Sequence, residues 1–269
     1  MSAPAVTPTP GRPTQLSMTR VALVGLAAGL LGGMFGVGGG LLIVPALTIV
    51  LGFEHRLAHG TSLAAILPIA GASLVTYATA GNVDWPIALW ISVGAILGAV
   101  LGTRLLQVVS RRALTIAFVI VMLVTAIRLF IPTEGTERDA LTVAAALGMF
   151  GVGLLSGTLA GLLGVGGGVI MVPAMIVLLG VPSVIAKGTS VAVIIPTSIM
   201  GTLRNLAMKN ADVRVGAVVG LAGVASAVAG SLIADTMSDP VSNALFAVLL
   251  LVVAARQLAT LRADRASLP

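Results

Sequence analysis

Two copies of a glycine-rich motif, GVGGG, contain the residues best suited to bind a small ligand. They occupy positions 36–40 and 164–168. Consecutive glycines expose backbone N–H groups that can form an anion-binding nest, and a half-helix that starts after the turn adds the positive end of its dipole. The alternative is close helix packing, for which glycine is common in membranes. The candidate substrate-binding glycines are Gly36, Gly38, Gly39, Gly40, Gly164, Gly166, Gly167 and Gly168.

A second paired motif, Gly-Thr-Ser, occurs at 60–62 and 188–190. Its hydroxyl groups are predicted either to cap a helix that begins there or to hold an oxyanion at that helix N-terminus. Each copy follows a residue that can carry positive charge, His59 in the first and Lys187 in the second. The candidate anion-binding set therefore also includes His59, Thr61, Ser62, Lys187, Thr189 and Ser190.

The charged residues favour an anion over a cation as the ligand. All nine Asp and Glu residues fall in predicted loops or helix ends, so no intramembrane carboxylate relay for cation pumping is visible. Arg204, by contrast, lies within the apolar stretch SIMGTLRNLAM. It either extends its side chain to the membrane surface or faces a cavity, where it would attract an anion. Arg204 completes the candidate substrate-binding set.

The residues needed for enzyme chemistry are absent from the sequence. There is no Cys, there are only two His, and no HExxH or GxSxG motif occurs. His59 near Ser62 is the one conceivable catalytic dyad, and the second copy has Lys187 in place of the histidine. We therefore expect no catalytic residues, no bound metal and no cofactor, and a protein that is not an enzyme.

The elements that position these motifs are membrane helices. Of the 269 residues, 58% are hydrophobic and 9% are charged, and the mean hydropathy is +1.13. Soluble domains have about 25% charged residues, and a membrane span needs roughly 20 apolar residues. The composition predicts an all-α polytopic membrane protein with about eight spanning segments in a lipid bilayer. The net charge of +6 is read as a marker of membrane orientation, with no nucleic-acid partner.

The chain is predicted to be two related halves. Residues 29–68 align without gaps on residues 157–196, with 20 of 40 positions identical. Internal repeats are typical of transporters whose substrate site lies between the halves. The predicted organisation is a disordered tail at 1–19, a first transmembrane repeat at 20–131, a loop at 132–139, a second repeat at 140–261 and a C-terminal tail at 262–269.

The segment that opens each repeat has two possible structures, a kinked span or a hairpin that turns inside the membrane. Ordinary spans are predicted at 60–80, 86–107 and 112–131, and again at 188–207, 214–234 and 240–261. A hairpin would invert one repeat relative to the other and place 12 Lys and Arg residues on one side against three on the other. The positive-inside rule therefore favours inverted repeats with both termini in the cytoplasm.

The paired pattern GVGGG, then V-P, then A-x-G-T-S, resembles the sulfite exporter TauE/SafE family over about residues 20–260. The resemblance implies a transporter of small sulfur-containing anions, such as sulfite or an organosulfonate, in the cytoplasmic (inner) membrane. Alternating access would be driven by the substrate gradient or by a coupling proton or sodium ion. The alternatives are a transporter of another small anion, a channel and, less favoured, a membrane-embedded enzyme.

Overall fold

The computed structural model of the chain describes residues 17–105 and 143–266, together with scattered positions between 112 and 127. Six helices in these ranges are long and apolar enough to cross a membrane. They are α1 (Met18–Phe35), α3 (His55–Thr79), α4 (Trp85–Leu105), α6 (Val143–Leu163), α8 (Ser183–Ala207) and α11 (Asp239–Ala266). The described residues contain no strand, so the predicted all-α membrane fold is confirmed for them.

A seventh candidate span is a bent pair of helices. Helix α9 (Val213–Ala222) and helix α10 (Val224–Thr236) meet at Gly223 with a bend of 48°. Two shorter apolar helices complete the set, α2 (Gly40–Ile49) and α7 (Gly168–Leu179). The predicted span at 112–131 and the predicted loop at 132–139 lie largely or wholly outside the described residues.

Each opening segment is a hairpin in the structure. Left-handed glycines follow α1, with φ of 68° at Gly36 and 79° at Gly39, and they reverse the chain. A surface groove is lined by Arg20 and Leu23 of α1 together with Val50, which follows α2, so the end of α2 lies beside the start of α1. With 10 residues, α2 is about 15 Å long, half the thickness of a bilayer. Helices α6 and α7 repeat this arrangement around residues 164–168.

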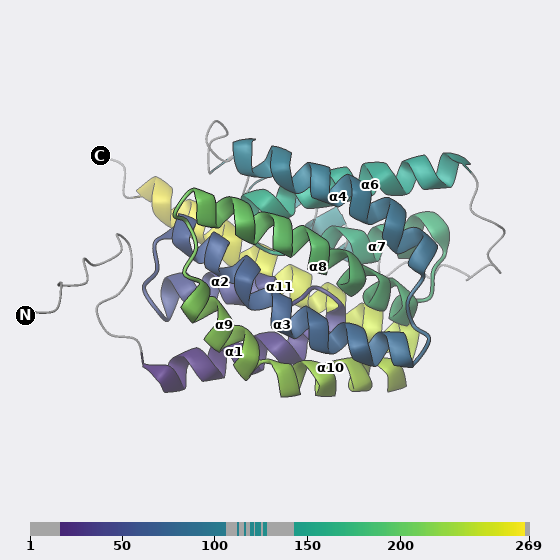
Figure 1. The fold of residues 1–269 in the computed structure, drawn as a ribbon, viewed down its shortest axis with the longest axis horizontal. Helices are drawn as coiled ribbons and strands as arrows, with labels where there is room; N and C mark the ends of the chain where they lie inside the picture. Colours follow the sequence, from purple (N-terminus) through teal and green to yellow (C-terminus); the bar gives the residue numbers. More distant parts are fainter. Residues whose placement is uncertain are drawn as a thin grey trace, which may run out of the picture.

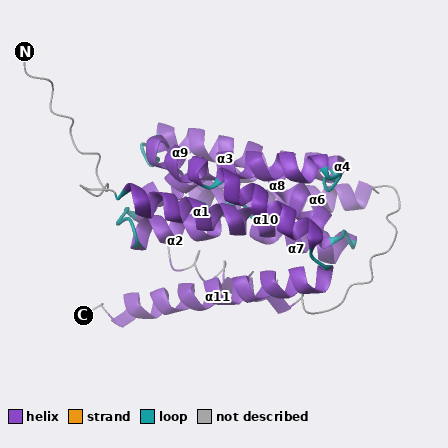
Figure 2. Ribbon diagram, turned by 90° about the horizontal axis from the view of Figure 1, so that it is seen from below, coloured by secondary structure: helices purple, strands orange, loops and turns teal. Residues whose placement is uncertain are grey.

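The equivalent helices of the two halves run in opposite directions. Figure 1 shows α1 and α3 starting at the end of the molecule where α11 finishes, whereas α6 and α8 start at the opposite end. We call the first the terminal end and the second the far end. Figure 2 shows α11 lying along one side of the bundle. This is the geometry that inverted repeats produce.

The halves are interleaved, because the first helix of each packs on the other half. A Cβ added to Gly25 of α1 would lie 2.3 Å from the Val219 carbonyl oxygen, and one added to Gly29 would lie 2.1 Å from that of Gly223. Small residues allow such close approach of backbones in membranes. The same packing joins α6 to α4, and it includes the small-residue face for which the sequence favours a packing role: Gly94, Gly98 and Gly102.

Several helix boundaries differ from the sequence prediction. Helix α1 starts inside the predicted tail, and α11 continues to Ala266 because RQLATLRADRA contains no helix breaker. Helices α3 and α8 begin at His55 and Ser183, each five residues before the expected starts at 60 and 188. The charged segment before the Gly-Thr-Ser motif therefore forms the first turns of a helix longer than the bilayer requires, and its polar residues extend beyond the apolar region.

Candidate functional site

The two GVGGG motifs meet at the centre of the molecule. A Cβ added to Gly40 would lie 2.8 Å from the Cα of Val165, and one added to Gly168 would lie 2.8 Å from the Cα of Val37. All ten residues of the two motifs are buried. The structure thus brings together the eight candidate glycines, which are 128 positions apart in the sequence, as the tips of two hairpins that enter from opposite ends.

The serine of each Gly-Thr-Ser motif holds the hairpin tip of the other half. The Ser62 hydroxyl donates a 2.8 Å hydrogen bond to the Gly164 carbonyl, and the Ser190 hydroxyl donates a 2.9 Å bond to the Gly36 carbonyl. Carbonyl groups at a helix C-terminus have no partner within their own helix. The two serine hydroxyls therefore supply donors to carbonyl groups at the ends of α1 and α6, and they fix the position of both hairpin tips.

The threonines form a second pair of bonds between the halves. Thr61 Oγ1 accepts a 2.9 Å hydrogen bond from the Asp212 backbone N–H, and Thr189 Oγ1 accepts one of 2.9 Å from that of Asp84. The two aspartates in turn cap the following helices: Asp212 accepts from Val215 N–H and Asp84 from Ile87 N–H. The Gly-Thr-Ser motif therefore positions the start of the next helix in the opposite half.

The expectation that Gly-Thr-Ser caps its own helix is wrong. Thr61 and Ser62 lie about two turns inside α3, and Thr189 and Ser190 lie equally far inside α8. Backbone N–H groups at that depth bond within the helix, so neither a cap nor an anion can use them. The N-termini that do lie at the centre belong to α2 and α7, which begin at Gly40 and Gly168 directly after left-handed glycines.

His59 and Lys187 occupy equivalent positions but have different surroundings. His59 Nδ1 donates to the Leu163 carbonyl at 2.5 Å, and the histidine is only partly buried. Lys187 is 1% exposed, its ammonium donates to the Ser242 hydroxyl on α11, and it lies 5.9 Å from the centre of the Phe35 ring. Within the described part of the chain, no carboxylate lies within 4.0 Å of the Lys187 ammonium, and Asp239 of α11 attracts it from a greater distance.

Arg204 lies apart from the second Gly-Thr-Ser motif. It is half-buried in the last turn of α8, four turns or roughly 20 Å beyond Ser190. Its neighbour Asn205 contacts the first motif instead, because a Cβ on Gly60 would be 2.8 Å from the Asn205 Cβ. The structure therefore places Arg204 at the terminal end, beyond the hairpin tips.

The centre is closed in this structure. A Cβ on Gly38 would be 2.8 Å from the Ile66 side chain, and one on Gly166 would be 3.4 Å from Ile66 and 3.5 Å from Ile194. Both isoleucines are fully buried. An anion can reach the N-termini of α2 and α7 only after these side chains and the hairpin tips separate.

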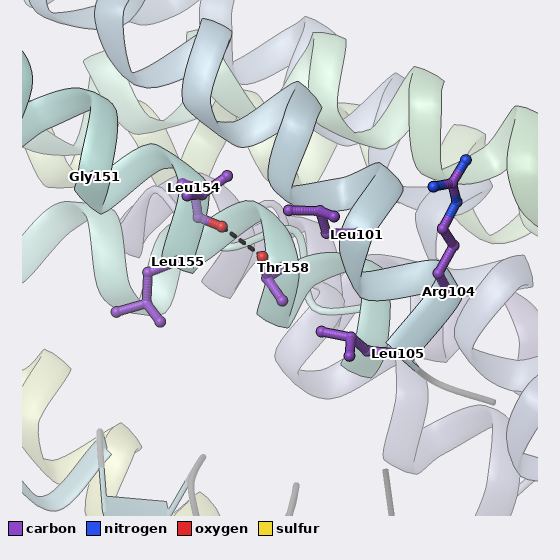
Figure 3. Close-up of a pocket in the computed structure, with 7 residues that line it drawn as sticks. All are labelled: Leu101, Arg104, Leu105, Gly151, Leu154, Leu155 and Thr158. Carbon is purple, nitrogen blue, oxygen red and sulfur yellow. Dashed lines mark hydrogen bonds between the residues drawn. The ribbon is translucent and has the colours of Figure 1, made fainter. Parts of the chain in front are cut away.

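A hollow of about 450 Å³ lies elsewhere, between α4 and α6. Figure 3 shows its leucine-rich lining, with the Arg104 side chain directed away from the other residues. Its one hydroxyl group, on Thr158, donates to the Leu154 carbonyl at 2.7 Å. This apolar groove contains none of the candidate site residues.

Sequence reasoning missed residues outside the motifs that contact the candidate set. The Ser242 hydroxyl accepts a hydrogen bond from the Lys187 ammonium, and the Ile66 and Ile194 side chains lie against Gly38 and Gly166. The two isoleucines could have been noticed as an identical aligned pair, whereas no motif or spacing points to Ser242.

Comparison with known proteins agrees with this geometry over most of the chain. The sequence model of the sulfite exporter TauE/SafE family matches residues 4–129 and 149–268. A probable membrane transporter protein of Xylella fastidiosa (strain 9a5c) is 28% identical over 238 residues, which cover 86% of this chain and 90% of the relative. The probable membrane transporter protein YunE of Bacillus subtilis is 27% identical over 216 residues, which cover 71% and 79%. Since the family match includes both hairpin tips and both Gly-Thr-Ser motifs, the chain belongs to the sulfite exporter TauE/SafE family of membrane transporters.

Proposed function

We propose that the protein is a secondary transporter that moves small sulfur-containing anions, such as sulfite or organosulfonates, across the cytoplasmic membrane. The observation that carries the proposal is the meeting of two half-helix N-termini, those of α2 and α7, between the halves. Half-helix N-termini at such an interface bind anionic substrate groups in other transporters, because their dipoles and unpaired N–H groups favour negative charge.

The buried ammonium of Lys187 supports an anionic substrate. A Cβ on Gly36 would lie 2.6 Å from the Lys187 Cα, so the lysine stands beside the first hairpin tip. A buried charge is strongly unfavourable unless it is paired, and membrane-buried cations mark ion pathways. Asp239 at the start of α11 attracts the ammonium electrostatically, and an anion bound between the tips would add counter-charge that Ser242 and Phe35 do not supply.

Alternating access would use the two equivalent serine bonds in turn. Breaking the bond from Ser62 to Gly164 would release one hairpin tip while the bond from Ser190 to Gly36 holds the other. Because the hairpins enter from opposite ends, each release would open the centre to one side. The substrate gradient, or a coupled proton or sodium ion, would drive net movement, with both termini in the cytoplasm.

Flux through purified protein in liposomes tests this function. Labelled sulfite, sulfate, thiosulfate and taurine are offered to wild type, to the Thr61→Ala plus Thr189→Ala double variant, and to Thr236→Ala, whose hydroxyl is exposed and bonded within α10. We expect saturable flux of at least one anion in wild type and Thr236→Ala, and loss of flux in the double variant. Unchanged flux in the double variant would reject a role for the threonine bonds between the halves in transport, and a folded wild type that moves none of the anions would reject the function.

A further inference from the structure

Three buried polar side chains on α8 carry hydrogen-bonding atoms that have no partner. They are Ser198 Oγ, Thr202 Oγ1 and Asn205 Oδ1. Their side chains are 0%, 7% and 1% exposed. Spacings of four and three residues place them on one face of the helix, which we call the α8 polar face.

Most other hydroxyl groups within the described helices behave differently. Thr197, directly before Ser198, bonds to the Val193 carbonyl of its own helix at 2.8 Å, and Ser231 bonds in the same way to Ala227 at 3.0 Å. Buried polar groups are nearly always satisfied, and the exceptions need a specific explanation. Atoms without partners on one helix face are suited to bind water or a polar ligand that is absent when the face is closed.

The α8 polar face lies against the first half at the terminal end. A Cβ added to Gly201, which lies within this face, would be 2.7 Å from the Leu63 side chain. A Cβ added to Gly60 of α3 would be 2.8 Å from the Asn205 Cβ. Ser62, which holds the Gly164 tip, lies between these two contacts on α3. Figure 1 shows the end of α8 and the start of α3 together at the terminal end. The face therefore leads from that end toward the second hairpin tip.

At the far end, the aligned positions of α3 do not repeat the three polar side chains. The positions of α3 that align with the three α8 residues are Ala70, Leu74 and Tyr77. Ala70 and Tyr77 are buried, and the Tyr77 hydroxyl is satisfied by a 2.7 Å bond to the Gly33 carbonyl. The far end also carries two buried atoms without a partner, Ser73 Oγ on α3 and Asn243 Oδ1 on α11, but they lie on separate helices, whereas the three at the terminal end share one face of α8.

We propose that the α8 polar face lines the aqueous route by which a small hydrated anion passes between the terminal end and the hairpin tips. This inference rests on the proposed transport function. The Ser198 and Thr202 hydroxyls donate to the anion, and the Asn205 Oδ1 accepts from its hydration water. Arg204, in the same turn as Asn205, and the exposed Lys209 and Arg214 beyond it supply positive charge at the entrance.

The absence of cysteine from the chain allows a direct test by single-cysteine labelling of the full-length protein. The test variants are Ser198→Cys, Thr202→Cys and Asn205→Cys. The controls are Ser231→Cys, which is equally buried but bonded within α10, and Ala70→Cys, which aligns with position 198. A charged, membrane-impermeant thiol reagent is added to each side of oriented vesicles without any anion substrate, and the terminal side is identified by a protease-sensitive N-terminal tag.

We expect the test cysteines to react from the terminal side at least about tenfold faster than the two controls, because thiol reactivity follows exposure to water. Sulfite-like anions that are transported should slow the labelling. Equal reactivity of Ser198→Cys, Thr202→Cys and Ser231→Cys, or faster labelling from the far side, would overturn the route. Labelling is measured without substrate, so its result does not depend on the flux assay. The aqueous route can therefore be rejected while transport is confirmed, or confirmed while transport is rejected. Ser198→Cys exchanges a single atom and serves as the variant least able to disturb folding.

Discussion

Helices α3 and α8 occupy equivalent places in the two halves, and they agree in one region and differ in another. At Gly-Thr-Ser, both donate the same serine bond to the opposite hairpin tip and accept the same bond from an aspartate N–H. Beyond Pro68 and Pro196, α3 carries Ala70, Leu74 and Tyr77 where α8 carries polar residues. The shared bonds hold the scaffold, and the unshared residues distinguish its two ends.

The residue that precedes Gly-Thr-Ser differs as well. Lys187 is buried and contacts α11, whereas His59 is partly buried and binds the Leu163 carbonyl. A symmetric scaffold allows opening to either side, and an asymmetric charge can make the two open states unequal in their affinity for an anion. We therefore expect changes at shared positions to alter both stability and transport, and changes at unshared positions to alter transport with little loss of stability.

The largest effect on stability is expected from a side chain at the hairpin tip. Gly39→Ala places a Cβ 2.5 Å from the Ala28 carbonyl oxygen at a φ of 79°, and we expect it to reduce the free energy of unfolding by about 3 kcal/mol. Gly167→Ala meets its nearest atom at 3.0 Å and should lose only about 1–2 kcal/mol from the left-handed conformation. Equilibrium unfolding in detergent measures both, with the open helical position Gly71→Ala as control. An equal loss of unfolding free energy in Gly39→Ala and Gly71→Ala would contradict the close packing of the hairpin tip.

The largest effect on transport is expected at the buried charge. Lys187→Met should lower anion flux at least about tenfold, a loss of roughly 1.4 kcal/mol in transition-state stability. It should leave the unfolding free energy unchanged or raise it, because an apolar side chain of similar volume replaces a buried charge. His59→Gln should have a smaller effect on flux. A Lys187→Met protein that transports normally would show that the ammonium is structural.

A smaller, symmetric effect is expected from the serine bonds. Ser62→Ala and Ser190→Ala each leave a buried carbonyl without its donor, and each should lose about 1–3 kcal/mol of stability. The two losses should agree because the bonds have nearly equal lengths. Ser226→Ala, which removes a bond within α10, is the matched control in the same unfolding measurement. A loss confined to one half would mean that the tips are held by different contacts.

The smallest effect is expected at the two helix caps. Asp84→Ala and Asp212→Ala each remove one N-cap bond, which should lower stability by about 1 kcal/mol. Thermal unfolding in detergent measures the stability of both variants, with the exposed Thr236→Ala as reference. A loss several times larger in one variant would indicate that its aspartate carries a further function.

The sequence predicts the membrane fold and the paired motifs because both depend on local composition and spacing. The uneven Lys and Arg distribution also favoured the hairpins that the structure contains. Which half each motif contacts could not be predicted, since an internal alignment shows equivalence and carries no information on contact. Ser62 illustrates the difference: its position suggested a cap on its own helix, and its hydroxyl binds Gly164 of the other half.

Binding stoichiometry tests the central claim most directly, that the two halves together form one anion site between their hairpin tips. Equilibrium binding of a labelled, transported sulfur anion to purified protein should show one saturable site per chain. Because both tips form the site, Ser62→Ala in one half and Ser190→Ala in the other should each weaken it. Two independent sites per chain, or a single site that only one of these changes affects, would contradict the account.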